Sequence, residues 1–192
     1  MIITISGTPG SGKSTIAQIL VEQLHAERLY VGGIRRDLAR EKGMTLVELN
    51  EYAKTHPETD VDVDKAAAAH ARALDKQGKI VVVEGRTQYH FLPESLKIFI
   101  KVDVEEGTRR IWNDLQNEKT RTERNEGDIT SLDQMKKRIR QRVTEDNKRY
   151  LKYYSINPAD ESQYDLVIDT TKITAEQGAQ QILDYLRQRR LW

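Results

Sequence analysis

The residues with the clearest chemical potential form the segment Gly7-Thr8-Pro9-Gly10-Ser11-Gly12-Lys13-Ser14, which matches the pattern G-x-x-x-x-G-K-[ST]. Glycine allows the backbone to curl so that several N–H groups point at phosphate oxygens, and a following helix N-terminus adds partial positive charge. Lys13 is expected to reach the β- and γ-phosphates, and the Ser14 hydroxyl is expected to bind Mg²⁺. With Thr15, this segment predicts a nucleoside triphosphate site. A glycine-rich turn with a chance lysine is the alternative, which the strand before it and the helix after it disfavour.

A second group of cationic residues could hold another phosphate. Arg35 and Arg36 follow the second expected strand, and Gly85-Arg86 follows the third. Open parallel sheets bind ligands beyond the carboxyl ends of their strands, so these arginines are expected on the same edge as the glycine-rich loop. Guanidinium groups suit bidentate contacts with a dianionic phosphate. We therefore predict an acceptor phosphate there, with ordinary surface arginines as the alternative.

Two further features could serve phosphoryl transfer. Glu84 ends a buried strand, where its carboxylate could hold a Mg²⁺-bound water or could cap nearby N–H groups. Arg142, Asp146 and Arg149 are spaced i, i+4 and i+7, so they share one helical face on which Asp146 can orient both arginines. An exposed ion-pair ladder, which contributes little, is the alternative. Arg110 is a further lid candidate.

The elements that must position these residues alternate between short β-branched segments and longer helical ones, which predicts an α/β fold with a five-stranded parallel sheet flanked by helices. The expected strands are Ile2–Ser6, Arg28–Val31, Ile80–Glu84, Leu96–Val102 and Tyr164–Ile168. The expected helices are Lys13–His25, Ile34–Glu41, Leu46–Lys54, Thr59–Gln77, Val104–Leu115, Ser131–Tyr154 and Thr174–Arg189. The polar segment Asn113–Thr130 is expected to be a lid, with a solvated surface loop as the alternative.

The composition excludes several classes of function. Lys and Arg number 31 against 30 Asp and Glu, so no global positive field would hold nucleic acid, and no stable nucleic-acid partner is expected. The sequence has no cysteine, which excludes disulfides, thiolate catalysis and cysteine-zinc sites, and its 4 histidines show no metal spacing. No apolar segment approaches the roughly 20 residues that span a bilayer, and the N-terminus lacks a basic leader. We expect a soluble, cytoplasmic protein with a single domain, residues 1–192, and no membrane partner.

Several blocks in a defined order are similar to the nucleoside monophosphate kinases, and most similar to the archaeal-type cytidylate kinases. These blocks are Ile2-Ile3-Thr4-Ile5-Ser6-Gly7, Gly10-Ser11-Gly12-Lys13-Ser14, Arg36-Asp37-Leu38-Ala39, Lys42-Gly43-Met44, Glu84-Gly85-Arg86, Lys148-Arg149-Tyr150 and Tyr164-Asp165-Leu166-Val167-Ile168-Asp169-Thr170. The resemblance covers nearly the whole chain. It implies a P-loop NTPase fold with a monophosphate-binding insert at about residues 32–64 and a helical lid at about residues 113–149.

The resemblance also implies an ATP:CMP phosphotransferase that accepts dCMP and uses ATP and Mg²⁺. The residues that match acceptor-binding positions are Arg36, Asp60, Asp64, Gly85 and Arg86. Those that match positions near ATP, beyond the loop Gly7 to Thr15, are Arg110 and Thr170. The residues expected to act in transfer are Lys13, Arg142, Asp146 and Arg149. Ser14 and, through a water, Glu84 would hold the metal.

The chain departs from the family pattern at two positions. Thr87 follows Arg86 where the longer bacterial relatives carry an aspartate that helps to read cytosine, and Gly107 replaces an arginine. These departures leave other acceptors open: UMP, another nucleoside monophosphate or a non-nucleotide metabolite. A non-catalytic nucleotide-binding module is the alternative from another class, with slight support from basic tracts such as Arg187–Arg190. We expect a monomer that acts on a small-molecule nucleotide substrate.

Overall fold

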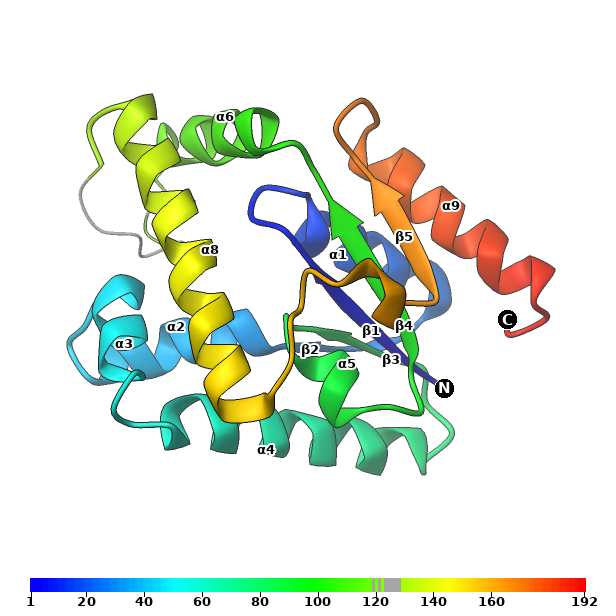
Figure 1. Cartoon of the computed structure of the whole chain (residues 1–192). Helices are drawn as coiled ribbons and strands as arrows, with labels where there is room; N and C mark the ends of the chain where they lie inside the picture. Colours follow the sequence, from blue (N-terminus) through cyan, green and yellow to red (C-terminus); the bar gives the residue numbers. More distant parts are fainter. Residues whose placement is uncertain (119, 121, 123–128) are drawn as a thin grey trace.

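The structure is a computed structural model that describes residues 1–118, 120, 122 and 129–192. Within these residues, the chain forms a five-stranded parallel sheet with the order β2-β3-β1-β4-β5 (Figure 1). The strands are β1 (Ile2–Gly7), β2 (Glu27–Tyr30), β3 (Val81–Glu84), β4 (Leu96–Lys101) and β5 (Leu166–Asp169). All residues of β1 and β3 are buried, as expected for strands covered on both faces.

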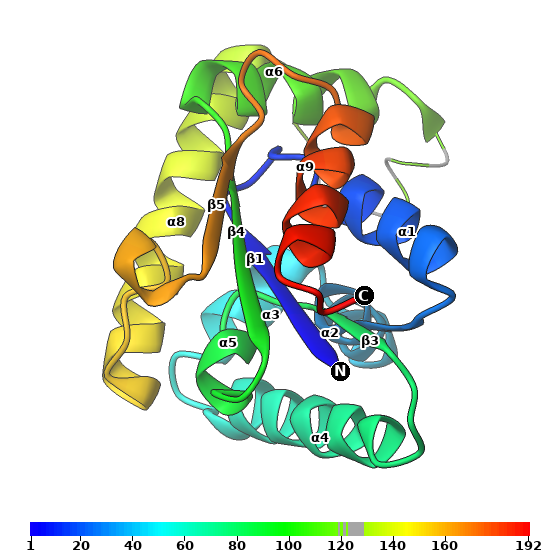
Figure 2. The same cartoon turned by 90° about the vertical axis from the view of Figure 1, so that its right-hand side faces the viewer.

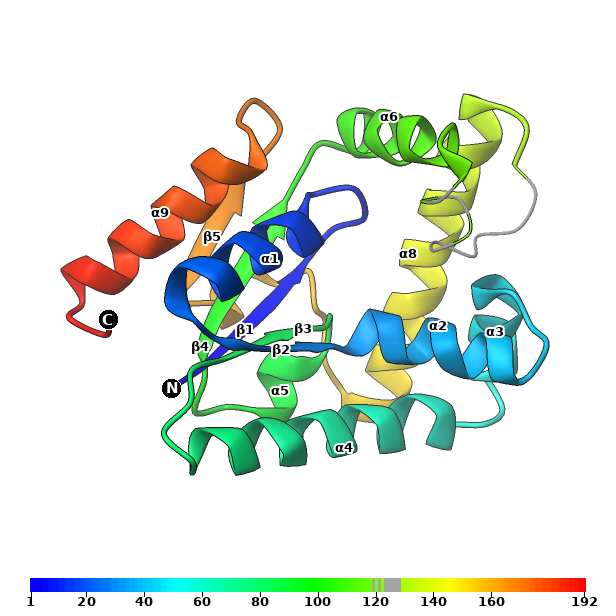
Figure 3. The same cartoon turned by 180° about the vertical axis from the view of Figure 1, so that it is seen from behind.

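Helices cover both faces of this sheet. They are α1 (Lys13–Leu24), α2 (Val31–Glu41), α3 (Leu46–Tyr52), α4 (Glu58–Asp75), α5 (Gln88–Phe91), α6 (Val104–Leu115), α8 (Leu132–Tyr154) and α9 (Ala175–Gln188), with a 3-10 turn η1 at Glu161–Gln163. Figure 2 places α1 and α9 together on one side of the strands, and Figure 3 shows both from behind. In that layer Ile3 packs with Leu20 and Ile182, whereas Val83 packs on the opposite layer with Ala71 of α4.

The topology brings the candidate site to one edge of the sheet. The glycine-rich loop follows β1, Gly85 follows β3, and α2 follows β2, so all three begin at carboxyl ends of parallel strands (Figure 1). Helix α8 then runs from α6 past α2 to the first turns of α4 (Figure 1). The Tyr153 hydroxyl of α8 donates to the carbonyl of Ala53 at 2.7 Å, and Lys54 pairs with Glu145 at 2.9 Å. These contacts join α8 to the segment between α3 and α4.

The sequence predicted the sheet and its helices correctly, but the predicted start of α2 was wrong. The expected helix from Ile34 begins at Val31, and the second strand ends at Tyr30 instead of Val31. Glycines occupy the first turn of α2 because the Tyr30 ring lies against it: a Cβ added at Gly33 would sit 2.7 Å from Tyr30 Cδ1. The other ends differ by one or two residues, and the short elements α5 and η1 were not predicted.

Part of the expected lid falls outside the described residues. The segment Asn113–Thr130 contains residues 119, 121 and 123–128, which the structure does not describe, and its first residues continue α6 to Leu115. Across the residues that are described, no helix combines the length and apolar character needed to cross a bilayer.

Candidate active site

The glycine-rich loop is held by backbone and side-chain contacts from neighbouring strands. The Thr8 N–H donates to the carbonyl of Ile100 at 3.0 Å, and the Thr8 hydroxyl accepts from Val102 N–H at 3.1 Å. On the other side, the buried Thr170 hydroxyl donates to the carbonyl of Ser11 at 2.9 Å. The loop is therefore clamped between the ends of β4 and β5, as a preformed phosphate cradle requires.

A pair of glycines lets α6 pack directly on this loop. Gly10 adopts a φ of 76°, and a Cβ added there would lie 2.3 Å from the carbonyl oxygen of Gly107. A Cβ at Gly107 would lie 2.7 Å from the carbonyl oxygen of Pro9. Any larger residue at position 107 would push α6 away, which gives a physical reason for the glycine that stands where the family pattern has an arginine.

Lys13 extends from the first turn of α1 across the mouth of the loop, where its Nζ donates to the carbonyl of Thr8 at 3.3 Å. Burial lowers the pKa of Lys13 to about 7, and the nearby charge of Arg86 adds to this effect, while Glu84 opposes it. An ammonium group in such surroundings gains from an added anion, because the anion restores its charged form.

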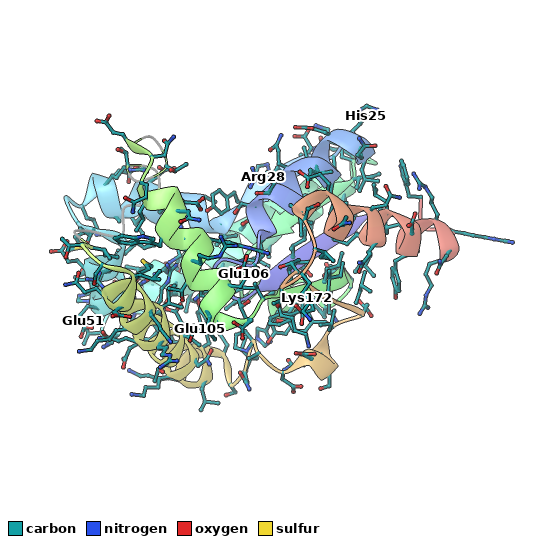
Figure 4. All side chains as sticks on the ribbon, turned by 90° about the horizontal axis from the view of Figure 1, so that it is seen from above. His25, Arg28, Glu51, Glu105, Glu106 and Lys172 are labelled. Carbon is teal, nitrogen blue, oxygen red and sulfur yellow. The ribbon has the colours of Figure 1, made fainter. Side chains whose placement is uncertain are left out.

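Ser14 and Glu84 come together beside the loop, as predicted. The Ser14 hydroxyl donates to Glu84 Oε1 at 2.5 Å, and Glu84 is 3% exposed. A hydroxyl beside a carboxylate is the type of oxygen donor set that suits Mg²⁺ shared with phosphates. Arg28, labelled in Figure 4, pairs with Glu84 Oε2 at 2.7 Å and was missed by the sequence analysis. The available signal was an arginine inside a short strand beside the buried β3.

The predicted acceptor arginines line the same pocket as the loop. Arg36 donates from Nη1 to the Tyr30 hydroxyl at 2.6 Å and to the carbonyl of Gly32 at 3.0 Å. Arg86 forms an ion pair with Asp146 of α8. The pocket has a volume of about 1130 Å³, which exceeds the roughly 300–1,000 Å³ of ordinary single-ligand sites. Its size and its several lining cations suit two phosphate-bearing ligands held close together.

Asp146 is the centre of a buried charge cluster. Its carboxylate accepts from Arg149 Nη2 at 2.9 Å and pairs with Arg86, while Arg142 Nε lies 3.8 Å away. The i, i+3 and i, i+4 neighbours therefore face Asp146 as the spacing predicted. Burial alone would raise the pKa of Asp146, but the charges of the three arginines hold it below its ordinary value.

Asp60, near the start of α4, is buried and bound to arginines. It forms ion pairs with Arg35 of α2 and with Arg149 of α8, and it is 3% exposed. Arg35 also donates to the Asn50 side-chain carbonyl at 2.9 Å. The Asp60 carboxylate therefore links three helices at the wall of the pocket.

Asp64 lies one turn further along α4 and is held by neutral donors. It accepts from the hydroxyls of Thr87 at 2.8 Å and Tyr154 at 2.9 Å, and from the Gln88 amide at 2.9 Å. Burial raises the pKa of Asp64, and these hydrogen bonds only partly oppose the shift. Thr87, a departure from the family pattern, thus fixes a carboxylate that lines the pocket.

Arg110 and Thr170 also meet, at the outer end of the loop. Arg110 Nη2 donates to the carbonyl of Thr170 at 2.7 Å, and its Nε donates to Glu106, labelled in Figure 4, at 2.8 Å. Among the predicted residues, Gly7, Thr8 and Thr170 do not line the pocket. They hold the loop from behind instead. The remaining predicted residues all line it: Pro9, Gly10, Ser11, Gly12, Lys13, Ser14, Thr15, Arg36, Asp60, Asp64, Glu84, Gly85, Arg86, Arg110, Arg142, Asp146 and Arg149.

Comparisons with solved structures confirm the P-loop NTPase fold. A protein-family model described as "AAA domain" matches residues 3–131. An uncharacterized protein from Eubacterium ventriosum superposes with a TM-score of 0.62 and 21% identity, over 97% of this chain and 98% of its own. A shikimate kinase from Acinetobacter baumannii gives a TM-score of 0.59 and 18% identity, over 100% of this chain and 95% of its own. At these identities the likeness concerns the fold alone.

Relatives with higher identity are archaeal cytidylate kinases. The one from Methanocaldococcus jannaschii is 37% identical over 181 residues, which is 92% of each chain. The one from Methanosarcina mazei is 34% identical over 190 residues, 97% of this chain and 94% of its own. The one from Pyrococcus furiosus is 34% identical over 90% of this chain and 81% of its own. Because these relatives are at least 34% identical over 90% or more of this chain, the chain belongs to the cytidylate kinase family.

Proposed function

We propose that this protein transfers the γ-phosphoryl group of ATP to CMP or dCMP, which yields ADP and CDP or dCDP. The observation that carries this proposal is the arrangement of two phosphate-binding groups in one pocket. Lys13 and the glycine-rich loop line this pocket, and Arg36 and Arg86 line it as well. The relatives named cytidylate kinase support the choice of a cytosine monophosphate as acceptor.

In this reaction an oxygen of the acceptor phosphate attacks the γ-phosphorus, and the bond from the γ-phosphorus to the β–γ bridging oxygen breaks. The acceptor oxygen is already ionised at neutral pH, since the second pKa of a phosphate monoester is about 6. No proton has to be removed, so the protein needs alignment and positive charge more than a base. Asp146 fits this requirement, because a carboxylate with a lowered pKa is a weak base and a good partner for arginine.

The chain's cations would divide this work between them. Lys13 would neutralise charge on the β- and γ-phosphates as the bond breaks, and Arg142 and Arg149 would follow the transferred group from α8. Arg36 and Arg86 would hold the acceptor phosphate. For Arg86 this means that the acceptor competes with Asp146, its present partner. Arg110, which lines the pocket, would contact the adenosine end of ATP, and Thr170 would support this contact by accepting a hydrogen bond from Arg110.

The oxygens of Ser14 and Glu84 suit Mg²⁺, and we propose that they hold it, Ser14 directly and Glu84 through water. When bound, Mg²⁺ would supply positive charge to the β- and γ-phosphates. Arg28 would orient the Glu84 carboxylate through their ion pair.

We further propose that residues 32–64 form the acceptor insert and residues 113–149 the lid of a single kinase domain, residues 1–192. We expect a cytoplasmic monomer that acts on dissolved nucleotides, without a stable nucleic-acid partner. Light scattering after gel filtration should then give a mass near 22.2 kDa. A mass twice this value would overturn the monomer.

An acceptor screen tests the function. Initial rates of ADP formation are measured with Mg²⁺ and ATP alone and with CMP, dCMP, UMP, AMP, GMP or shikimate added. We expect CMP and dCMP to raise ADP formation far above the rate with ATP alone and above the other acceptors. ADP formation that does not respond to CMP, or that responds most to shikimate, would refute the proposal.

A further inference from the structure

The guanidinium group of Arg149 has an incomplete set of hydrogen bonds in a buried position. Its side chain is 2% exposed, its Nε is bound to Asp60, and its Nη2 donates to Asp146 at 2.9 Å. Among the described residues, its Nη1 makes no hydrogen bond of good geometry, although the Tyr150 side chain lies beside the guanidinium group. The Arg149 side chain lines the pocket.

Asp60 holds the Arg149 guanidinium from outside helix α8. Asp146 is on the same helix as Arg149, and it could follow any movement of α8. Asp60 instead belongs to α4, 89 residues away in the chain, and it also binds Arg35 of α2. The Arg149 guanidinium is therefore held at Nε by a carboxylate of α4 and at Nη2 by a carboxylate of α8.

The Asp60 carboxylate already has two guanidinium partners, which reduces its capacity to bind a substrate donor itself. Four arginines, Arg35, Arg86, Arg142 and Arg149, share the two carboxylates of Asp60 and Asp146, so the cluster has a surplus of positive charge. A buried ion-pair cluster is a weak source of stability, because desolvation offsets the attraction. Stability alone therefore gives little reason for the cluster, whereas the precise placement of a cation gives a clear one.

We propose that Asp60 is a positioning residue, whose buried carboxylate holds Arg149 and Arg35 in the wall of the pocket so that Arg149 can contact the phosphoryl group that passes to the acceptor nucleotide. This deepens the proposed function and rests on it. It differs from the expectation that Asp60 contacts the acceptor directly. ATP binding is not expected to depend on Asp60, because its partners lie on α2 and α8 and not on the glycine-rich loop.

The test is a double-mutant cycle on kcat/KM for CMP, with Asp60→Asn, Arg149→Met and the double variant. Asp60→Asn is expected to lower kcat/KM for CMP by about one to two orders of magnitude, with KM for ATP nearly unchanged. In the Arg149→Met background the same substitution should cost less than about threefold, because Asp60 acts through Arg149. Equal costs in both backgrounds would overturn the proposal.

Asp62→Asn is the matched control, since it removes the same charge from an exposed position of α4. It should leave kcat/KM for CMP within about twofold of the wild type. If Asp60→Asn behaves like this control, the proposal fails. If the wild type itself forms no ADP in response to CMP, the proposed function fails instead, so the two failures are distinct.

A measurement on the wild-type protein covers the case in which Asp60→Asn does not fold. In ¹⁵N-edited spectra of the ligand-free protein, the Nε–H of Arg149, assigned with Arg149→Lys, should exchange with water much more slowly than that of the exposed Arg109. Exchange as fast as that of Arg109 would mean that Asp60 does not hold Arg149, and it would overturn the proposal.

Discussion

The glycine-rich loop lies in one pocket with the arginine wall, which consists of Arg35, Arg36, Arg86 and Arg149 with their partners Asp60 and Asp146. The two differ in how far apart in the chain their residues lie. The loop is nine consecutive residues, 7–15, shaped by backbone geometry and clamped by β4 and β5. The wall is assembled from side chains of α2, α4, α8 and the end of β3, held by ion pairs such as Arg86–Asp146 and Arg149–Asp60. A site made of backbone is set when the strand and helix form, whereas a site made of paired side chains depends on how whole helices dock.

This difference predicts that the two sides fail in separate ways, and Lys13→Ala should give the largest effect. Lys13 contacts charge that grows during transfer, so we expect kcat to fall by about 10²–10³-fold with a smaller rise in KM for ATP. KM for CMP should stay close to the wild-type value. Steady-state kinetics with both substrates varied would measure this, and a kcat within a few-fold of the wild type would refute the assigned role.

In the arginine wall, Arg36→Ala should weaken binding of the acceptor. Loss of a charge-assisted contact of about 2 kcal/mol corresponds to a roughly 30-fold rise in KM for CMP. KM for ATP should change little. Arg72→Ala, which removes an equal charge from the outer face of α4, is the control and should leave both constants unchanged. If Arg36→Ala raised KM for ATP as much as KM for CMP, the arginine wall would not act separately from the loop, and the prediction would be wrong.

The packing of α6 on the loop gives a smaller and purely steric test. In Gly107→Ala the new Cβ would meet the carbonyl oxygen of Pro9 at 2.7 Å, so the loop or α6 must shift. We expect KM for ATP to rise by about 3- to 10-fold while KM for CMP is retained. Gly178→Ala is the control within a helix, because the tightest contact of its Cβ would be with the Ile16 side chain at 3.0 Å and it would meet no backbone atom this closely. Identical kinetics for both variants would show that the loop does not need the close approach.

Proton uptake should give the smallest of these differences, between ATP binding at the loop and CMP binding at the arginine wall. Because the pKa of Lys13 is lowered to about 7, the side chain is mostly neutral at pH 8 in the ligand-free protein. Bound triphosphate favours the ammonium form, so ATP binding should take up a proton, and ATP affinity should fall as the pH rises from 7 to 9. Arginines remain charged throughout this range, so CMP binding should take up none.

Titration calorimetry at pH 8, in two buffers that differ in ionisation enthalpy, measures this uptake directly. The Lys13→Ala variant should show none with ATP. Equal heats in both buffers for the wild type would contradict the lowered pKa.

The same difference explains which features could be predicted from the sequence. The loop and the strands were predictable because their signals are local: glycine spacing, apolar runs and the i, i+4 pattern around Asp146. The pairing of Asp60 with Arg149 was not, since it depends on how α8 docks against α4 across 89 residues. Nor was the early start of α2, which follows from the Tyr30 ring packing on Gly33. Contacts between side chains of distant helices produce no periodic pattern in a single sequence, so one sequence does not predict them.

A crystal structure with a bisubstrate analogue, adenosine and cytidine joined by a polyphosphate, tests the central claim most directly. We predict that the adenosine-side phosphates lie in the loop 7–15 beside Lys13, and that the cytidine-side phosphate contacts Arg36 and Arg86, with Arg86 drawn from Asp146. A complex in which Arg36 and Arg86 keep their present partners, and the cytidine end binds elsewhere, would contradict the account.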